Sequence, residues 1–292
     1  MDSITRGRAA KTAVLAGMLF CALTATAGAK AGLVPKAGLI PKLKSSSVLI
    51  IDQSDSSVLY SRNSDVAAPI ASITKLMTAL VVLDAKQPMD EPLEITEAEL
   101  DLPKQNFSRL AVGTVLTRGD LMHLALMSSE NRAAHVLGAN YPGGLRTFVA
   151  AMNAKAAALG MRSAHFADPT GLSSENVASP EDLSKLVIAA SRNAVIRDYS
   201  TDPSYTVRVH RHLVEFRNTD TLVKNPAWNI IVQKTGYIAE AGKCLVLEAV
   251  IQGRSVVIVL LDSLGKYTRV ADAQRVKSWM ESVSARRVVS MR

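Results

Sequence analysis

The chain has 292 residues, of which 48% are hydrophobic and 21% charged, a balance that excludes a disordered chain and predicts one compact unit, with or without an inserted lobe. Its formal net charge of +8 raises the question of a nucleic-acid partner. Aromatic residues make up only 4% and the lysines and arginines are scattered through polar faces, so we exclude nucleic acid as a partner.

Residues 1–29 form a predicted signal peptide. Arg6, Arg8 and Lys11 precede an uncharged apolar run, and Ala27-Gly28-Ala29 closes that run with the small residues of a cleavage site. We therefore predict export, cleavage after Ala29, and no stable membrane span in the mature chain. For an exported protein, an anionic cell-envelope substrate explains the positive charge as well as ordinary solubility does.

A linker and a hairpin follow the leader. Residues 30–46 contain a duplicated segment with prolines and glycines but no helical or strand period, so we predict a tether. The folded domain is predicted over 47–284, and it begins with a hairpin of two β-rich runs, Val48–Ile51 and Val58–Tyr60. An apolar helix over 71–86 comes next, and its lack of polar surface predicts that it is buried.

The middle of the chain, about 90–200, is predicted to be an all-helical lobe, and strands return after it. Apolar periodicity and capping residues predict helices at 120–127, 131–137, 145–159 and 183–190. Alternating or continuous apolar runs predict strands at 205–209, 213–216, 229–234, 244–251 and 256–261. A last helix ends in a basic tail, 285–292. Strands from both ends of the chain predict an α+β fold, a mainly antiparallel sheet covered by the first and last helices, with the helical lobe inserted and a cleft between them.

Three short motifs stand in order along this pattern: Ser72-Ile73-Thr74-Lys75, Ser129-Glu130-Asn131 and Lys234-Thr235-Gly236. Each alone is weak, because a second S-x-x-K begins at Ser263 and a second S-E-N begins at Ser174. An isolated S-x-x-K is more often a helix cap followed by a solvated lysine. Only the first set combines a serine at the start of an apolar helix with the other motifs in order, so we select that set.

The first two motifs predict a nucleophile and its proton carriers. A serine hydroxyl is a weak nucleophile until a base removes its proton, and the sequence suggests no aspartate–histidine pair for Ser72. We predict Lys75 as the base, since it shares a helical face with Ser72, with Cβ atoms about 5–6 Å apart. Lysine acts as a base only when it is neutral, which burial and the nearby cation of Lys234 both favour. Ser129 is predicted to relay a proton to the leaving amine, and Asn131 to hold Lys75 and the substrate amide.

The third motif is predicted to end a strand that lines the cleft, because it follows the apolar run from Ile230. Gly236 would let a substrate backbone lie close. Lys234 and Thr235 offer a cation and a hydroxyl to a substrate carboxylate. The amide of Tyr237 is predicted to complete an oxyanion hole with that of Ser72.

An ordered trio of motifs, S-x-x-K with S-D-N and K-T-G, is typical of β-lactamases and penicillin-binding proteins. The chain resembles the low-molecular-mass penicillin-binding proteins from about Ser47 to the last helix. The segments beginning at Pro69, Met127, Asp168 and Lys234 look like those of the D-alanyl-D-alanine endopeptidase branch. Glu130 replaces the aspartate of S-D-N, and we assign it no catalytic role.

The resemblance implies a β-lactamase/transpeptidase-like fold and a serine peptidase that cuts peptide cross-links in peptidoglycan. It implies peptidoglycan peptide stems as substrates, β-lactams as covalent inhibitors, a periplasmic location, and neither a metal nor an organic cofactor. His210 and His212 form no metal site by this interpretation, because no third ligand accompanies them at a usual spacing. Cys244, the only cysteine after the leader, is predicted to be a buried small hydrophobe.

Three other functions compete with this one. A class A β-lactamase needs a glutamate that activates water, usually in the motif E-x-x-L-N. This motif does not occur between Arg132 and Gln233, so we predict a long-lived penicillin adduct on Ser72. A D-alanyl-D-alanine carboxypeptidase shares the acyl-enzyme chemistry and stays an alternative. The short remainder after Gly236 leaves no room for the extra β domain and membrane tail of many carboxypeptidases, which favours the endopeptidase. A non-catalytic envelope-binding protein is the alternative of another class.

Overall fold

The computed structural model describes residues 41–100 and 108–290. The predicted signal peptide, 1–29, and most of the predicted linker, 30–46, lie outside the described residues. Within the described ranges, no helix combines the length and the apolar character needed to cross a membrane.

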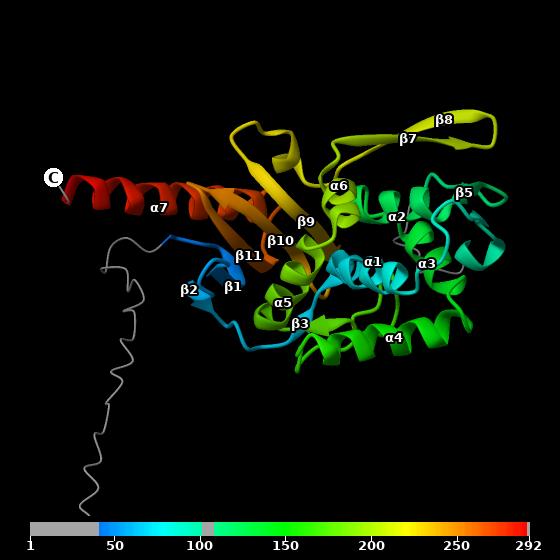
Figure 1. The fold of residues 1–292 in the computed structure, drawn as a ribbon, viewed down its shortest axis with the longest axis horizontal. Helices are drawn as coiled ribbons and strands as arrows, with labels where there is room; N and C mark the ends of the chain where they lie inside the picture. Colours follow the sequence, from blue (N-terminus) through cyan, green and yellow to red (C-terminus); the bar gives the residue numbers. More distant parts are fainter. Residues whose placement is uncertain (1–40, 101–107, 291–292) are drawn as a thin grey trace, which may run out of the picture. The chain divides into compact units, whose positions relative to one another are not determined.

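A five-stranded antiparallel sheet lies at the centre of the fold, in the order β2-β1-β11-β10-β9 (Figure 1). Its strands are β1 (Ser45–Asp52), β2 (Ser57–Arg62), β9 (Asn229–Ile238), β10 (Gly242–Ile251) and β11 (Arg254–Ser263). The first hairpin therefore pairs with the last one, through β1 and β11. This pairing of the two ends of the domain was predicted from the strand pattern, and the α+β fold class is confirmed.

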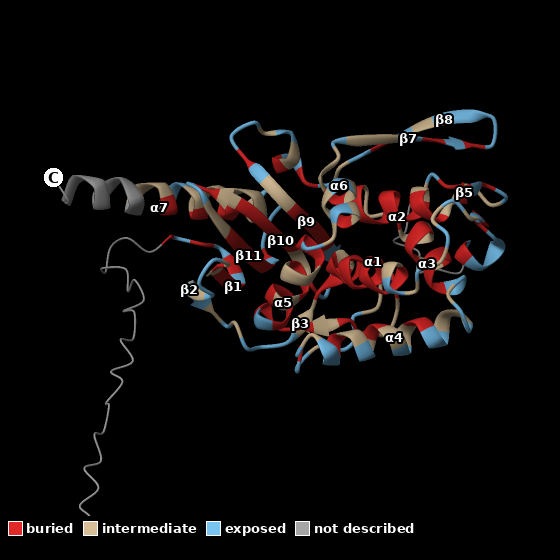
Figure 2. Cartoon of the chain, in the orientation of Figure 1, coloured by how far each residue is buried: buried red, intermediate tan, exposed pale blue. Residues whose placement is uncertain are grey.

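Both faces of the inner strands β1, β10 and β11 are buried along most of their length, which explains why these strands contain continuous apolar runs instead of alternating ones. Val48 and Ile50 point to a core shared with α7 (Thr268–Ser290), whereas Leu49 points to the larger core on the opposite face. The strands β10 and β11 are buried along most of their length (Figure 2). Helix α5 (Pro180–Ser191) contacts β1, β9, β10 and β11 on that opposite face.

The sheet was predicted to be covered by the first and last helices. The helix that covers it together with α7 is α5, not the first helix. The first helix, α1 (Thr74–Asp84), packs instead among α2, α3, α4 and α5, and nine of its residues are buried. Apolar periodicity predicts which face of a helix is buried but not which element packs against that face, so this assignment could not be made from the sequence.

The predicted lobe at 90–200 is largely helical but not wholly so. Its helices are α2 (Arg118–Met127), α3 (Asn131–Ala139), α4 (Gly144–Ala158), α5 and α6 (Ala194–Thr201). Short strands interrupt it: β4 (Pro92–Glu94) pairs with β5 (Val115–Thr117), and β6 (Val177–Ala178) pairs with β3 (Ala68–Pro69). These strands of two or three residues carry no readable period, so the sequence did not predict them. A separate hairpin of β7 (Ser204–Val209) and β8 (His212–Arg217) follows α6 (Figure 1).

Both ends of the folded part differ from the predicted bounds. Strand β1 begins at Ser45, within the predicted linker, because the Asp272 carboxylate accepts hydrogen bonds from the amides of Lys44 and Ser45. At the other end, α7 continues to Ser290, into the predicted basic tail 285–292. Arginine favours helix and no glycine or proline interrupts that segment, so nothing stops the helix at 284.

Candidate functional site

A tight turn presents the predicted nucleophile. Ser72 lies in the 3-10 helix η1 (Ala71–Ile73), and α1 begins two residues later. Ala71 has a φ of +47°, a left-handed conformation that is costly for a residue with a Cβ. Strain of this kind is held in place by surrounding packing and is common at functional sites. The predicted helix over 71–86 therefore starts as a 3-10 turn with Ser72 at its centre.

The Lys75 amine contacts three oxygens. Its Nζ lies 2.8 Å from Ser72 Oγ, 2.6 Å from Asn131 Oδ1 and 2.6 Å from the carbonyl oxygen of Thr170. Carbonyl oxygens can only accept, so Asn131 and Thr170 take two N–H groups. A neutral amine has only two N–H groups, and its lone pair is then directed at Ser72 Oγ. The arrangement suits removal of the serine proton.

Burial allows the Lys75 amine to be uncharged near neutral pH. The Lys75 side chain is 1% exposed, and loss of hydration lowers its pKa to about 7, against opposing attraction from Asp168 and Glu130. Burial is also the main cause of the lowered pKa of Lys234, with repulsion from Lys75 as the next cause. Two buried cations facing one site thus disfavour full protonation of both.

A loop from α4 to β6 supplies the third oxygen. Asp168 Oδ1 accepts hydrogen bonds from the amides of Thr170 and Gly171, and Oδ2 accepts one from the amide of Ser173 and one from Asn176 Nδ2. This carboxylate holds the loop closed, so that the Thr170 carbonyl faces Lys75. The residues Asp168–Ser173 had been noted in the sequence only for their family resemblance, and no role was predicted for them.

The second motif forms the turn between α2 and α3. Ser129 has a φ of +62° and is half-buried, and Glu130 caps α3 by accepting a hydrogen bond from the amide of Arg132. Burial raises the pKa of the Glu130 carboxyl, and its cation neighbours are Lys75 and Arg132. The structure thus brings Asn131 to Lys75 directly. Among the described residues, no hydrogen bond joins the Ser129 hydroxyl to Ser72, Lys75 or Lys234.

The third motif lies inside β9, not at its end. Lys234, Thr235 and Gly236 pair with Val246, Leu245 and Cys244 of β10, and β9 runs on to Ile238. The strand was predicted to end here because the motif follows the apolar run from Ile230, but pairing with β10 continues through Tyr237 and Ile238.

Gly236 makes a close approach to the nucleophile turn. A Cβ at this position would lie 2.9 Å from the Ile70 carbonyl oxygen and 3.1 Å from the amide nitrogen of Ser72. The absence of a side chain at Gly236 therefore allows β9 to pack closely against η1. It was predicted instead to make room for the substrate backbone. Tyr237 follows; this residue is 58% exposed, and Lys243 Nζ lies 4.7 Å from the centroid of its ring.

The sequence matches the Peptidase_S11 family, described as D-alanyl-D-alanine carboxypeptidase, over residues 34–265. The chain belongs to this family. It is thus a serine D-alanyl-D-alanine peptidase, as the three motifs predicted.

Relatives of this S11 peptidase carry more specific names. It is 48% identical over 268 residues to a protein of Pseudomonas aeruginosa named D-alanyl-D-alanine endopeptidase, covering 90% of this chain and 86% of that one. An Escherichia coli protein of the same name is 44% identical over 251 residues, or 83% and 79% of the two chains. The Streptomyces K15 DD-transpeptidase structure shares the fold with a TM-score of 0.76 at 27% identity, over 82% of this chain and 97% of that one. A Mycobacterium tuberculosis D-alanyl-D-alanine carboxypeptidase matches with the same TM-score at 30% identity, over 86% and 95%.

Three further side chains of this S11 peptidase support the third motif and were not predicted from the sequence. Thr219 Oγ1 lies 2.6 Å from Thr235 Oγ1, while its amide donates to the Met127 carbonyl oxygen at 3.1 Å. Arg269 Nη1 donates to the Gly236 carbonyl oxygen at 2.9 Å. Asp220 is buried, and its attraction opposes the burial and the repulsion from Lys75 and Arg269 that together lower the pKa of Lys234. They come from the segment before β9 and from α7, so no local spacing in the sequence relates them to the motif.

Of the remaining predicted features, the two histidines lie on the β7–β8 hairpin, and Cys244 pairs with Gly236 of the third motif. His210 and His212 are exposed at the turn of the β7–β8 hairpin. Cys244 is fully buried in β10, as predicted for a small hydrophobe, and burial raises the pKa of its thiol to about 11.

Proposed function

We propose that this S11 peptidase is a periplasmic D-alanyl-D-alanine endopeptidase, which cuts peptide cross-links in peptidoglycan through an acyl-enzyme on Ser72. The observation that carries the proposal is the Lys75 amine, buried, with a pKa of about 7 and 2.8 Å from Ser72 Oγ. The names of the relatives at 48% and 44% identity support the endopeptidase over the carboxypeptidase. The apolar leader at 1–29 supports export.

Acylation begins when neutral Lys75 takes the Ser72 proton as Ser72 Oγ bonds to the carbonyl carbon of the D-alanyl residue. The amides of Ser72 and Tyr237 would hold the developing oxyanion. The Ser129 hydroxyl gives its proton to the leaving amine as the carbon–nitrogen bond breaks, and Lys75 returns a proton to Ser129. The net products are a free amine and a D-alanyl ester on Ser72.

Deacylation uses the same groups in reverse. Water attacks the ester carbon while Lys75 takes one of its protons, and Ser72 Oγ leaves and recovers that proton. Asn131 holds the Lys75 amine through both halves, since its Oδ1 accepts from Nζ at 2.6 Å. Lys234 and Thr235 would bind the carboxylate of the leaving residue, whose charge the buried ammonium complements.

The test uses purified protein with two substrates: a cross-linked muropeptide dimer and a monomeric muropeptide that ends in D-alanyl-D-alanine. We expect wild type to convert the dimer to monomers faster than it releases D-alanine from the monomer, as followed by mass spectrometry. Ser72→Ala should abolish both reactions and the covalent labelling by a fluorescent penicillin. Release of D-alanine without dimer cleavage would establish the carboxypeptidase instead. Unchanged activity in Ser72→Ala would refute the acyl-enzyme mechanism, and no reaction in either protein would favour the non-catalytic envelope-binding alternative.

Thr219 is expected to act as a positioning residue for Thr235, because the two hydroxyls share a hydrogen bond of 2.6 Å. Thr219→Val keeps the shape and removes the hydroxyl, and a partly buried hydrogen bond of this kind contributes about 1 kcal/mol. We expect about 5- to 10-fold slower acylation by penicillin, expressed in the second-order rate constant. Thr219→Ser should stay within about twofold of wild type, since it retains the hydroxyl. Equal losses in the two variants would assign the effect to packing instead.

A further inference from the structure

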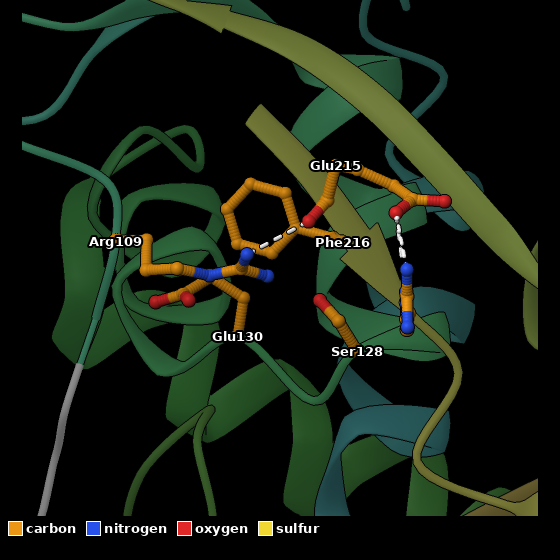
Figure 3. Close-up of a pocket in the computed structure, with 6 residues that line it drawn as sticks. Arg109, Ser128, Glu130, Glu215 and Phe216 are labelled. Atoms are coloured by element: carbon orange, nitrogen blue, oxygen red, sulfur yellow. Dashed lines mark hydrogen bonds and ion pairs between the residues drawn. The ribbon is translucent and has the colours of Figure 1, made fainter. Parts of the chain in front are cut away.

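A polar cavity of about 390 Å³ lies beside the turn that carries Ser129 (Figure 3). Two of its walls are different parts of the chain: Ser128 and Glu130 flank Ser129 on the α2–α3 turn, and β8 forms the opposite side. The residues that line it are Arg109, Ser128, Glu130, Glu215, Phe216 and Arg217. We call it the Arg109 cavity. The three motifs and the residues that support them do not explain this cavity, although Glu130 of the second motif and the nearby Ser128 form part of its wall.

Of the two guanidiniums that line this cavity, that of Arg109 makes no ion pair with a described residue. Glu215 pairs with Arg217 at 3.0 Å, and this contact lowers the pKa of the Glu215 carboxyl. The cations that attract Glu130 are Lys75 and Arg132. Among the described residues, no carboxylate lies within ion-pair distance of the Arg109 guanidinium, so an anionic ligand would complete the arrangement.

Arg109 is also held in place before any ligand binds. Its Nη1 donates to the Glu215 carbonyl oxygen at 2.7 Å, and its guanidinium carbon lies 4.1 Å from the centroid of the Phe216 ring. Figure 3 shows the guanidinium close to this ring. A guanidinium fixed by stacking keeps N–H groups for a carboxylate and loses little conformational entropy when it binds one.

The position of the cavity relates it to the leaving group. In the proposed reaction Ser129 protonates the leaving amine, and residues on both sides of Ser129 form the cavity wall. When D-alanine leaves, the leaving group is one amino acid. When a cross-link is cut, it is a second stem peptide, which extends beyond the amine and carries further free carboxylates. A binding surface beyond Ser129 is useful only to the second reaction.

We propose that the Arg109 cavity binds a carboxylate of the leaving stem peptide and thereby selects cross-linked substrates over terminal D-alanyl-D-alanine. This inference rests on the proposed endopeptidase function and names the part of the chain that would produce it. Arg109 is the binding residue, and Phe216 and the Glu215 carbonyl position it. Arg211, at the exposed turn of the same hairpin, does not line the cavity and provides a matched control.

The experiment compares Arg109→Gln and Arg211→Gln with wild type on the muropeptide dimer, on the monomer that ends in D-alanyl-D-alanine, and on a dimer in which the leaving-stem carboxylates are amidated except the one on the leaving residue itself. We expect Arg109→Gln to lower the ratio of kcat/KM for dimer over monomer by about 10- to 100-fold, the usual contribution of a charge-assisted hydrogen bond. Wild type should lose as much on the amidated dimer, and Arg109→Gln should lose nothing more there. Arg211→Gln should match wild type throughout.

An unchanged ratio in Arg109→Gln, or an equal loss on dimer and monomer, would overturn the cavity proposal. Wild type that does not cut the dimer would instead reject the endopeptidase function. In that case a binding measurement tests the cavity proposal independently of catalysis. Ser72→Ala protein should bind the dimer more tightly than Ser72→Ala/Arg109→Gln protein in calorimetric titration, and equal affinities would overturn the proposal.

Discussion

Replacing Lys75 with methionine is expected to slow acylation of Ser72 by about 10²- to 10⁴-fold, the usual range for loss of a general base. Methionine matches the apolar stem of lysine and carries no amine, so the side chain still fills its buried site. The second-order rate constant for labelling by a fluorescent penicillin measures the effect, and thermal unfolding checks that the protein is folded. A folded Lys75→Met protein that labels at the wild-type rate would exclude Lys75 as the base.

The pH profile of wild type tests the same residue without a substitution. With a pKa of about 7, Lys75 is mostly charged below pH 6 and mostly neutral above pH 8. Because only the neutral amine can take the Ser72 proton, the acylation rate should rise about tenfold per pH unit below pH 7 and level off above pH 8. A rate that is flat from pH 5.5 to 8.5, or that begins to rise only above pH 9, would contradict a buried neutral lysine.

The part of the site that could be predicted from the sequence is the part built by local structure. Ser72 and Lys75 are three residues apart where the 3-10 turn η1 leads into α1, so local helical geometry brings them together. The order of the motifs and the strand pattern then gave the fold class. The carbonyl of Thr170 could not be found in this way. A backbone oxygen has no residue-type signal, and its contact with Lys75 joins positions 95 apart in the chain.

The supporting hydrogen bonds illustrate the same limit. Thr219 contacts Thr235, which lies 16 positions later in the chain, and Arg269 contacts Gly236 from the last helix. Their roles depend on how β9 packs, which follows from the whole sheet. The one local signal available was Asp168-Pro169-Thr170-Gly171, because aspartate before a glycine commonly closes a turn through its carboxylate. That signal predicts a turn, but not that the turn faces the nucleophile.

Gly171→Ala is expected to be the most damaging substitution by a single methyl group. Gly171 has a φ of +79°, and a Cβ there would lie 2.0 Å from the Ala71 carbonyl oxygen and 2.9 Å from the amide nitrogen of Ser72. Both neighbours are backbone atoms, so one of the two turns must move. We expect a loss of about 3–5 kcal/mol in the free energy of unfolding, in the range reserved for severe steric mechanisms. Acylation by penicillin should also fall, because moving either turn separates Ser72 and the Thr170 carbonyl from Lys75.

Gly160→Ala separates the steric effect from the conformational one. Gly160 also has a left-handed backbone, with a φ of +71°, but a Cβ at this position would meet no neighbouring atom within 4 Å. This variant should therefore show only the cost of a left-handed alanine, about 1–2 kcal/mol, with an unchanged acylation rate. Urea unfolding of the two variants gives the difference directly. If Gly171→Ala is destabilised no more than Gly160→Ala, the two turns are not in the close contact that aligns Ser72, Lys75 and Thr170, and the geometry on which the base assignment rests would be wrong.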